Sequence, residues 1–160
     1  MATNEYAGYI YLQLKSIASL YDIDFHLYLE SSGGFGELCM DWDELNGYAL
    51  YGDERGEKHS LFTTHEFDEF KYEVFLQLCF RMGLEYEMKH RSLDYLRKDE
   101  DDLEGDTRKI AFEETIRLLT TMSADWAERA AEQYTKYLNM WRRTKNVQYD
   151  FETSTFRTVD

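Results

Sequence analysis

The sequence predicts an α+β domain with an N-terminal helix, an antiparallel β-meander of about four strands, and three further helices that include one long central helix. Apolar residues recur at helical spacing before residue 22 and after residue 63, and they alternate with polar residues in between. A chain of 160 residues suits one domain, which we place at residues 1–145, followed by a C-terminal tail at 146–160.

The first helix is expected over residues 5–21, and a strand is expected to follow it. The helical stripe consists of Tyr6, Tyr9, Ile10, Leu14, Ile17, Leu20 and Tyr21. Over residues 23–30 the period falls to two, which is typical of a half-buried strand. A Ser-Ser-Gly-Gly turn comes next, and the alternation resumes over residues 38–42, as expected for an antiparallel neighbour.

Two more strands complete the predicted meander, over residues 47–53 and 58–63. Asn46 and Gly47 form a strong hairpin signal, because both residue types tolerate the left-handed backbone that tight turns need. The second hairpin is expected to turn around the Arg-Gly-Glu sequence at residues 55–57.

The central helix is expected to begin at Thr63 or the next residue and to run to about Arg91. Thr63 and Glu66 have the spacing of a capping box, in which two side chains satisfy backbone groups at the start of a helix. Apolar residues cover most of the circumference, so this helix should be largely buried. Arg81 and Glu85 lie four residues apart and are expected to form an ion pair.

Residues 92–106 are too acidic and too poor in apolar side chains for a core position, so they are expected to form a solvated connection. Two helices follow. The apolar stripe of the first consists of Ala111, Phe112, Thr115, Leu118, Leu119 and Met122. Ser123 is a suitable cap for the last helix. One face of that helix is lined by Trp126, Ala127, Ala130, Ala131, Tyr134, Tyr137, Leu138 and Trp141.

The formal net charge of −14 argues against nucleic acid as a ligand, since phosphate binding requires clustered Lys and Arg. An acidic surface suits a basic partner, and it also keeps a chain soluble without any partner. No apolar run approaches the roughly 20 residues that cross a bilayer, and the first residues lack the pattern of a secretory signal. We therefore expect a cytoplasmic protein that binds neither nucleic acid nor membrane.

No set of residues predicts an active site. Glu87 and His90 have the spacing found in carboxylate-bridged metal sites, but the other half of such a site is missing. Cys39 and Cys79 fall on apolar elements, where a thiol is a poor nucleophile. The glycines at 33–36 join two strands, whereas a phosphate loop leads into a helix. We expect no enzyme activity, no metal and no cofactor.

Several short motifs, none of them specific alone, follow one another along the chain: Glu54-Arg55-Gly56, Thr63-Thr64, Asp68-Glu69-Phe70-x-Tyr72-x-Val74-Phe75, Glu85-Tyr86-Glu87-x-Lys89-His90-Arg91, Asp106-x-Arg108-Lys109-x-x-Phe112, Leu118-Leu119 and Trp126-Ala127-Glu128-Arg129. Their order and spacing over about residues 48–138 resemble the Immunity protein 63 family of bacterial polymorphic toxin systems. This chain departs from the family pattern in two places. An acidic insertion occupies residues 92–105; it would suit discrimination among toxins, but a tolerated surface loop is the favoured interpretation. Lys109 stands where a second Arg is expected, which loses the two-pronged hydrogen bonding of a guanidinium.

The resemblance implies a protein that binds and neutralises a cognate toxin without turnover, by covering its active site or a nearby surface. If the toxin is a nuclease, its basic cleft would attract this acidic chain. Contact residues are then expected in the first hairpin turn, in the insertion and at two tyrosines: Asp41, Asp43, Glu44, Asp99, Glu100, Asp101, Asp102, Glu104, Tyr28 and Tyr48. The alternatives are a small acidic regulatory or adaptor protein without a toxin partner and, less favoured, a metal-dependent helical enzyme. The oligomeric state is not predicted.

Charged residues at the ends of elements are expected to have a structural role instead. The expected ion-pair residues are Glu54, Arg55, Arg81, Glu85, Arg91 and Arg108. Breaking a partly buried ion pair costs about 3–5 kcal/mol, so Arg55→Ala should lower stability more than affinity.

Overall fold

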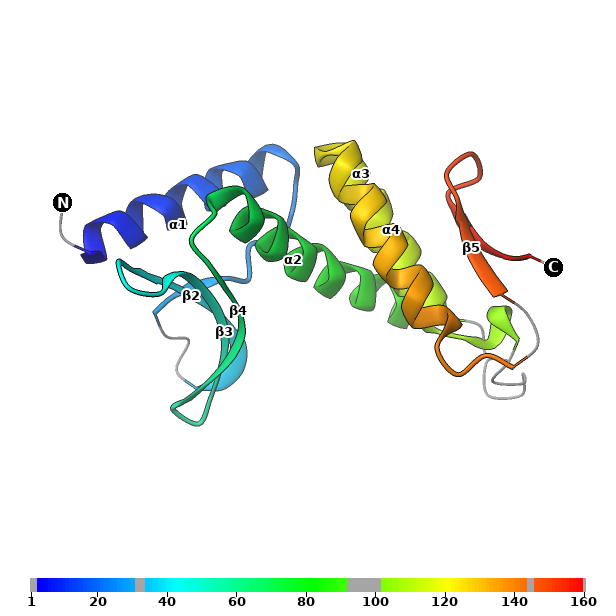
Figure 1. Ribbon diagram of the computed structural model, residues 1–160, viewed down its shortest axis with the longest axis horizontal. Helices are drawn as coiled ribbons and strands as arrows, with labels where there is room; N and C mark the ends of the chain where they lie inside the picture. Colours follow the sequence, from blue (N-terminus) through cyan, green and yellow to red (C-terminus); the bar gives the residue numbers. More distant parts are fainter. Residues whose placement is uncertain (1–2, 31–33, 92–101, 144–145, 160) are drawn as a thin grey trace. The chain divides into compact units, whose positions relative to one another are not determined.

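The computed structural model describes residues 3–30, 34–91, 102–143 and 146–159 (Figure 1). The chain forms two compact units, Met1–Leu78 and Cys79–Asp160. Helix α2 (Phe67–His90) contributes residues to both units. The proposed domain boundary at residue 145 stays a prediction.

The described residues confirm the predicted fold class, with an N-terminal helix, a meander and three more α-helices. The helices besides α2 are α1 (Thr3–Leu20), α3 (Arg108–Met122), α4 (Ala124–Asn139) and the short 3-10 helix η2 (Leu103–Gly105). The strands are β1 (Tyr28–Leu29), β2 (Phe35–Asp43), β3 (Gly47–Glu54), β4 (Glu57–Thr64), β5 (Asn146–Asp150) and β6 (Thr155–Val159). Strands β1–β4 form one sheet in sequence order, and β5 and β6 form a separate hairpin.

The first strand differs from its prediction. Of the expected residues 23–30, only two join the sheet as β1, and they pair parallel to β2 rather than antiparallel. Glu30 explains the change, because its φ of 71° turns the chain back while its N–H donates to the Met40 carbonyl at 2.9 Å. The expected alternation of burial still holds, since Ile23 and Leu27 are buried and Tyr28 is exposed.

Two hairpins build the rest of the sheet as predicted. Gly47 must be glycine, because a Cβ atom there would lie 2.5 Å from the Thr64 carbonyl oxygen. Arg55 and Gly56 both have positive φ, at 54° and 80°, as a two-residue hairpin turn of type I′ requires. Strand β4 lies at the edge of the sheet, and Leu61 is an extra residue in its register with β3.

The core of unit 1 lies between the sheet, helix α1 and the first part of α2. Helix α1 runs beside the sheet in Figure 1, contacts β2 and contributes Leu14, which is fully buried. An aromatic cluster forms around Tyr48, whose ring stacks on Phe70 with centroids 5.1 Å apart. The Tyr6 and Tyr48 hydroxyls share a hydrogen bond of 2.5 Å, and Tyr6 also meets the Trp42 ring edge to face.

Helix α2 begins later than predicted. Residues 63 and 64 complete strand β4, and the Thr64 hydroxyl oxygen accepts the Glu66 N–H at 3.0 Å. The Glu66 carbonyl then accepts the Phe70 N–H, which opens the helix. The predicted capping box of Thr63 and Glu66 is therefore wrong, since Thr64 supplies the hydroxyl instead. The cross-strand pairing of Tyr48 with Thr64 holds the backbone in the sheet at this point.

Close contact between α2 and α3 forms the first part of unit 2. At Gly83 the helices approach so closely that a Cβ atom would lie 2.5 Å from the Ala111 carbonyl oxygen. Phe112 stacks on Tyr134 of α4 with ring centroids 4.0 Å apart, and Phe80 borders both rings. The Ser123 hydroxyl oxygen accepts the Trp126 N–H at 3.3 Å, which confirms the predicted cap of α4.

The connection before α3 and the end of α4 correct two expectations. The acidic segment contributes Leu103 to the core, although the whole of residues 92–106 was expected to be solvated. Helix α4 ends at Asn139, so Trp141 lies outside it and is 87% exposed, whereas the sequence placed it on the buried face. The Asn139 side chain ends the helix by pairing with the backbone N–H and C=O of Val147, at 2.6 and 3.0 Å.

The tail, which shows no clear sequence period, forms the β5–β6 hairpin. Phe156 is buried, and its backbone N–H donates to the Glu113 carboxylate of α3 at 2.9 Å. The same carboxylate pairs with Lys109 at 2.7 Å, so one acidic side chain joins two turns of α3 to the hairpin.

Candidate functional site

The acidic turn between β2 and β3 is the best-defined part of the expected contact surface. The Asp43 carboxylate accepts the backbone N–H of Asn46 at 2.6 Å and the side-chain amide at 3.1 Å. These hydrogen bonds, led by the backbone bond from Asn46, hold the pKa of Asp43 below its ordinary value. Asp43 therefore stays ionised and fixes the turn, while Glu44 at its tip is exposed.

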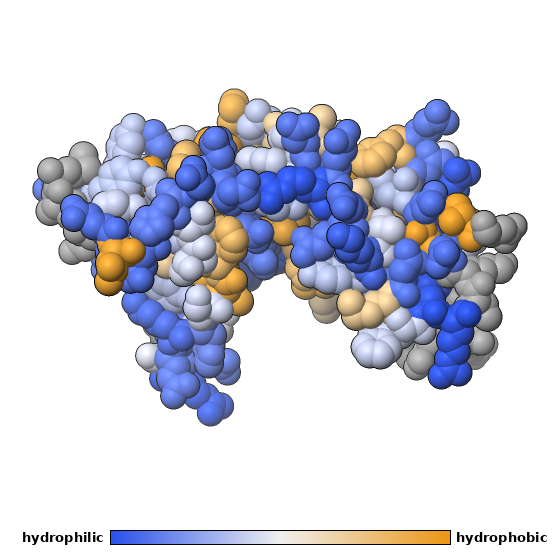
Figure 2. All heavy atoms as spheres, in the orientation of Figure 1, coloured by the Kyte–Doolittle hydropathy of each residue, from blue (hydrophilic) through white to orange (hydrophobic). Residues whose placement is uncertain are grey.

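The turn also presents an apolar residue that the sequence reasoning did not single out. Leu45 is 84% exposed, and Figure 2 shows apolar groups bordering hydrophilic ones at this turn. Protein interfaces combine an apolar centre with a polar rim, and an exposed apolar side chain with carboxylates nearby offers both kinds of group. The sequence could have indicated that Leu45 is exposed, because this residue lies between Asp43 and Asn46 at the tip of a predicted hairpin, and the tips of turns face solvent.

The other contact candidates in unit 1 have different surroundings. Asp41 is partly buried and accepts the backbone N–H of Trp42 at 2.7 Å. Tyr28 is exposed on β1. Tyr48 is only 6% exposed, and its ring belongs to the aromatic core, so it offers almost no surface to a partner. Burial, together with the hydrogen bond to Tyr6, raises the Tyr48 pKa.

The candidates in the acidic insertion fall partly outside the described residues, because Asp99, Glu100 and Asp101 do not belong to them. Asp102 is exposed and caps η2 by accepting the Glu104 N–H at 3.0 Å. Glu104 is largely exposed and lies 3.9 Å from the Lys109 ammonium. Their role as contacts stays a prediction.

The expected structural residues also differ from one another. Arg81 and Glu85 lie 3.8 Å apart in an exposed pair, and Arg91 binds the buried Glu87 carboxylate at 2.7 Å. Within the described part of the chain, neither Glu54 nor Arg55 has an ion-pair partner. The Arg55 backbone N–H donates to the Gly34 carbonyl instead, at 2.8 Å.

Arg108 belongs to a larger network around Asp106. The Arg108 guanidinium donates two hydrogen bonds to the Asp106 carboxylate, at 2.7 and 2.9 Å, and a third to the Tyr137 carbonyl of α4. Arg142 approaches the same carboxylate at 3.3 Å and donates to the Leu138 carbonyl at 2.7 Å. Burial raises the pKa of Asp106, but the hydrogen bonds and charges of the two arginines outweigh burial and lower it. The network joins the start of α3 to the end of α4.

The chain turns sharply between the end of α4 at Asn139 and Arg142. The Arg142 N–H donates to the Asn139 carbonyl at 3.2 Å, and Met140 has φ −60° and ψ 127°. Trp141 follows with φ 73°, which matches the third position of a type II turn. That position favours Gly or Asn, and a bulky side chain there costs on the order of 1–3 kcal/mol.

Nucleophilic and metal chemistry find little support among the described residues. Cys39 and Cys79 are both fully buried, and burial raises the pKa of Cys79 to about 12. Glu87 is committed to Arg91, and His90 Nδ1 lies 2.8 Å from the Tyr86 carbonyl oxygen in the preceding turn. In the part of the chain that the structure describes, no three His, Cys, Asp or Glu side chains gather as metal ligands would.

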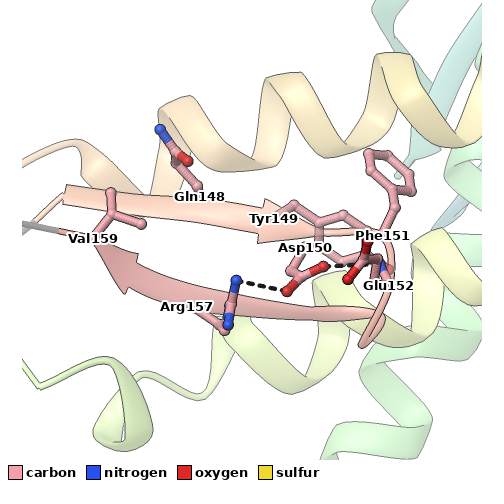
Figure 3. A pocket seen from close by; sticks show the side chains of 7 residues that line it. All are labelled: Gln148, Tyr149, Asp150, Phe151, Glu152, Arg157 and Val159. Atoms are coloured by element: carbon pink, nitrogen blue, oxygen red, sulfur yellow. Dashed lines mark hydrogen bonds and ion pairs between the residues drawn. The ribbon is translucent and has the colours of Figure 1, made fainter.

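An open depression lies along the C-terminal hairpin (Figure 3). Asp150 and Arg157 face each other across it at 2.7 Å, and Phe151 and Glu152 stand at the turn. Because the two charged groups neutralise each other and the depression is open to solvent, it lacks the convergent polar groups of a small-molecule site.

The described part of the chain contains no helix with the length and apolar character that a membrane crossing needs. Fold and site together define a small α+β protein with acidic turns, an exposed apolar residue at a hairpin tip, and buried thiols.

A family model, Immunity protein 63, matches residues 43–136, which is more than half of the chain. The chain therefore belongs to the Immunity protein 63 family. No curated protein and no solved structure matches it.

Proposed function

We propose that this protein binds a cognate toxin in the cytoplasm of the producing cell and neutralises it by covering a functional surface, without turnover. The family match over residues 43–136 carries the proposal. The net charge of −14 supports a basic partner. A nuclease toxin fits this requirement, because its substrate-binding cleft is basic. Nucleic acid, membrane, metal and cofactor are not part of the proposal.

The acidic turn between β2 and β3 is the contact surface that we propose in unit 1. Its carboxylates would steer a basic partner, and charged rims of this kind mainly raise the association rate. Leu45 adds apolar area at the tip, where burial against a partner would slow dissociation.

The first experiment tests rescue and binding together. The C-terminal domain encoded by the upstream gene is expressed with and without this chain, and complex formation is measured on the purified proteins. Rescue from killing together with a stable complex is the expected result. Killing that continues unchanged with this chain present would refute the proposal for that toxin. An upstream-encoded domain that does not kill the cell would favour the adaptor alternative.

A second experiment locates the surface. The double variant Glu44→Lys/Leu45→Asp should bind the toxin at least tenfold more weakly than the parent. The Glu44→Lys change should act mainly by lowering the association rate. Glu128→Gln on the exposed side of α4 raises the net charge by one, as the double substitution does (+2 from Glu44→Lys and −1 from Leu45→Asp), so it serves as the matched control. Equal losses in the control would assign the effect to net charge alone.

A further inference from the structure

The turn between β2 and β3 places an asparagine directly before a glycine, and this pair occurs once in the sequence. Asn46 is exposed at the turn, and Gly47 opens β3 with a φ of 74°. A Cβ atom at position 47 would lie 2.5 Å from the Thr64 carbonyl oxygen, so the fold requires glycine at this point. The packing of the sheet therefore keeps a glycine behind an exposed asparagine.

An asparagine side chain can react with the backbone nitrogen of the next residue. The Gly47 nitrogen would bond to the side-chain carbonyl carbon of Asn46, and Asn46 Nδ2 would leave as ammonia with the proton that the Gly47 N–H gives up. Water then opens the five-membered ring at either carbonyl, which yields aspartate or isoaspartate. A side chain on the second residue hinders the attack, and glycine has none. The other asparagines of the chain all precede larger residues: Asn4, Asn139 and Asn146.

Asp43 holds the Asn46 side chain in another direction. Its Oδ2 accepts a hydrogen bond from Asn46 Nδ2 at 3.1 Å, and its Oδ1 accepts the Asn46 backbone N–H at 2.6 Å. The amide is therefore directed towards a residue three positions earlier, whereas the reaction needs its carbon at the nitrogen one position later. A single hydrogen bond at an exposed site shifts a local equilibrium only about tenfold, so this contact should slow the reaction without preventing it.

We propose that Asn46 is a site of spontaneous deamidation, and that Asp43 limits its rate by holding the side-chain amide away from the Gly47 nitrogen. The product alters the turn that contains it. A second carboxylate would replace the amide that donates to Asp43, and like charges at this distance repel. Isoaspartate would also lengthen the loop between Asp43 and Gly47, which are paired across the hairpin.

This chemistry needs no partner. Its consequence for toxin binding rests on the proposed function, because Glu44 and Leu45 of the proposed contact surface lie in the same turn. The test uses this protein alone, so a negative result would leave the proposed function standing.

Peptide mapping by mass spectrometry follows the conversion of Asn46 in the purified full-length protein at physiological temperature and pH. The same protein unfolded in guanidinium gives the rate without any turn. The folded parent should convert about tenfold more slowly than the unfolded chain. Asn146, which is exposed but precedes valine, should stay largely unmodified over the same period. A folded parent whose Asn46 stays intact while the unfolded chain converts completely would refute the site.

Two variants test the role of Asp43. Asp43→Ser removes the acceptor of the Asn46 amide, while its hydroxyl can still accept the Asn46 backbone N–H, so conversion should be about tenfold faster than in the parent. Glu44→Gln removes one negative charge from the same turn and leaves both hydrogen bonds in place, so this matched control should convert at the rate of the parent. Equal rates in the two variants would overturn the role of Asp43. If Asp43→Ser does not fold, the folded and unfolded parent still decide whether Asn46 is a site.

Discussion

Replacing Asp106 with Asn tests whether one carboxylate secures the end of unit 2. The Asp106 side chain is 9% exposed and the Arg142 side chain 5%, so the substitution breaks a buried ion pair with the Arg142 guanidinium. Breaking a buried pair in this way costs about 3–5 kcal/mol. The Arg108 side chain is 47% exposed, and its share of the pairing is worth at most about 1 kcal/mol.

We therefore expect Asp106→Asn to lower the free energy of unfolding by about 3 kcal/mol, because the amide oxygen retains part of the hydrogen bonding. For a chain of this size such a loss corresponds to a fall of roughly 6–12 °C in melting temperature. Urea titration followed by circular dichroism measures the change. The control is Glu132→Gln, which breaks an exposed pair with Lys136 and should cost less than about 1 kcal/mol.

The pH dependence gives an independent check on the same network. The pKa of Asp106 is lowered in the folded protein, so its contribution is fully present above the unfolded pKa of about 3.9 and is lost as pH falls through the folded pKa. The stability difference between the parent and Asp106→Asn should therefore be constant at neutral pH and shrink in acid below about pH 4. A variant that is as stable as Glu132→Gln at pH 7, or a difference that grows in acid, would refute the reasoning.

Three further expectations concern packing, turn geometry and thiol access. Gly83→Ala should destabilise the protein by about 1–2 kcal/mol in urea titration, since its Cβ would meet the Ala111 carbonyl at 2.5 Å; an unchanged midpoint would mean that the helices separate at little cost. Arg55→Asn should raise stability by about 0.5 kcal/mol, because Asn suits the φ of 54°; a loss instead would point to an ion pair of Arg55. Cys39 and Cys79 should resist a thiol reagent in native buffer and react fully in denaturant, and rapid native labelling would contradict their burial.

Local patterns in the sequence predicted the elements that local forces determine. Helix α1, strands β3 and β4, and the Ser123 cap follow from periodicity and short-range hydrogen bonds, and the structure agrees with each. Strand β1 could not be predicted in the same way, because alternation reports which side chains are buried and says nothing about the direction of the neighbouring strand. The turn at Glu30 decides that direction.

The candidate site was harder to predict, because its geometry depends on residues distant in sequence. Asp106 follows a run of acidic residues in the sequence, and its contact with Arg142, 36 positions later, distinguishes it from the exposed Asp102 and Glu104. The apolar stripe of α4 continues to Trp141, and the pattern therefore favoured a longer helix. The Asn139 side chain overrides that preference by bonding to the Val147 backbone beyond the helix end, and the Arg142 guanidinium binds the Leu138 carbonyl in the last turn of the helix.

The bulge at Leu61 affects how this protein behaves at high concentration. An eight-residue edge strand is a template on which a second chain can add a strand, and a continuous, flat edge is the usual starting point for aggregation. The extra residue interrupts the edge in its middle, and Glu57 and Lys58 place charges at one end. The bulge and these charges therefore disfavour the addition of a second chain to this edge when the protein is concentrated.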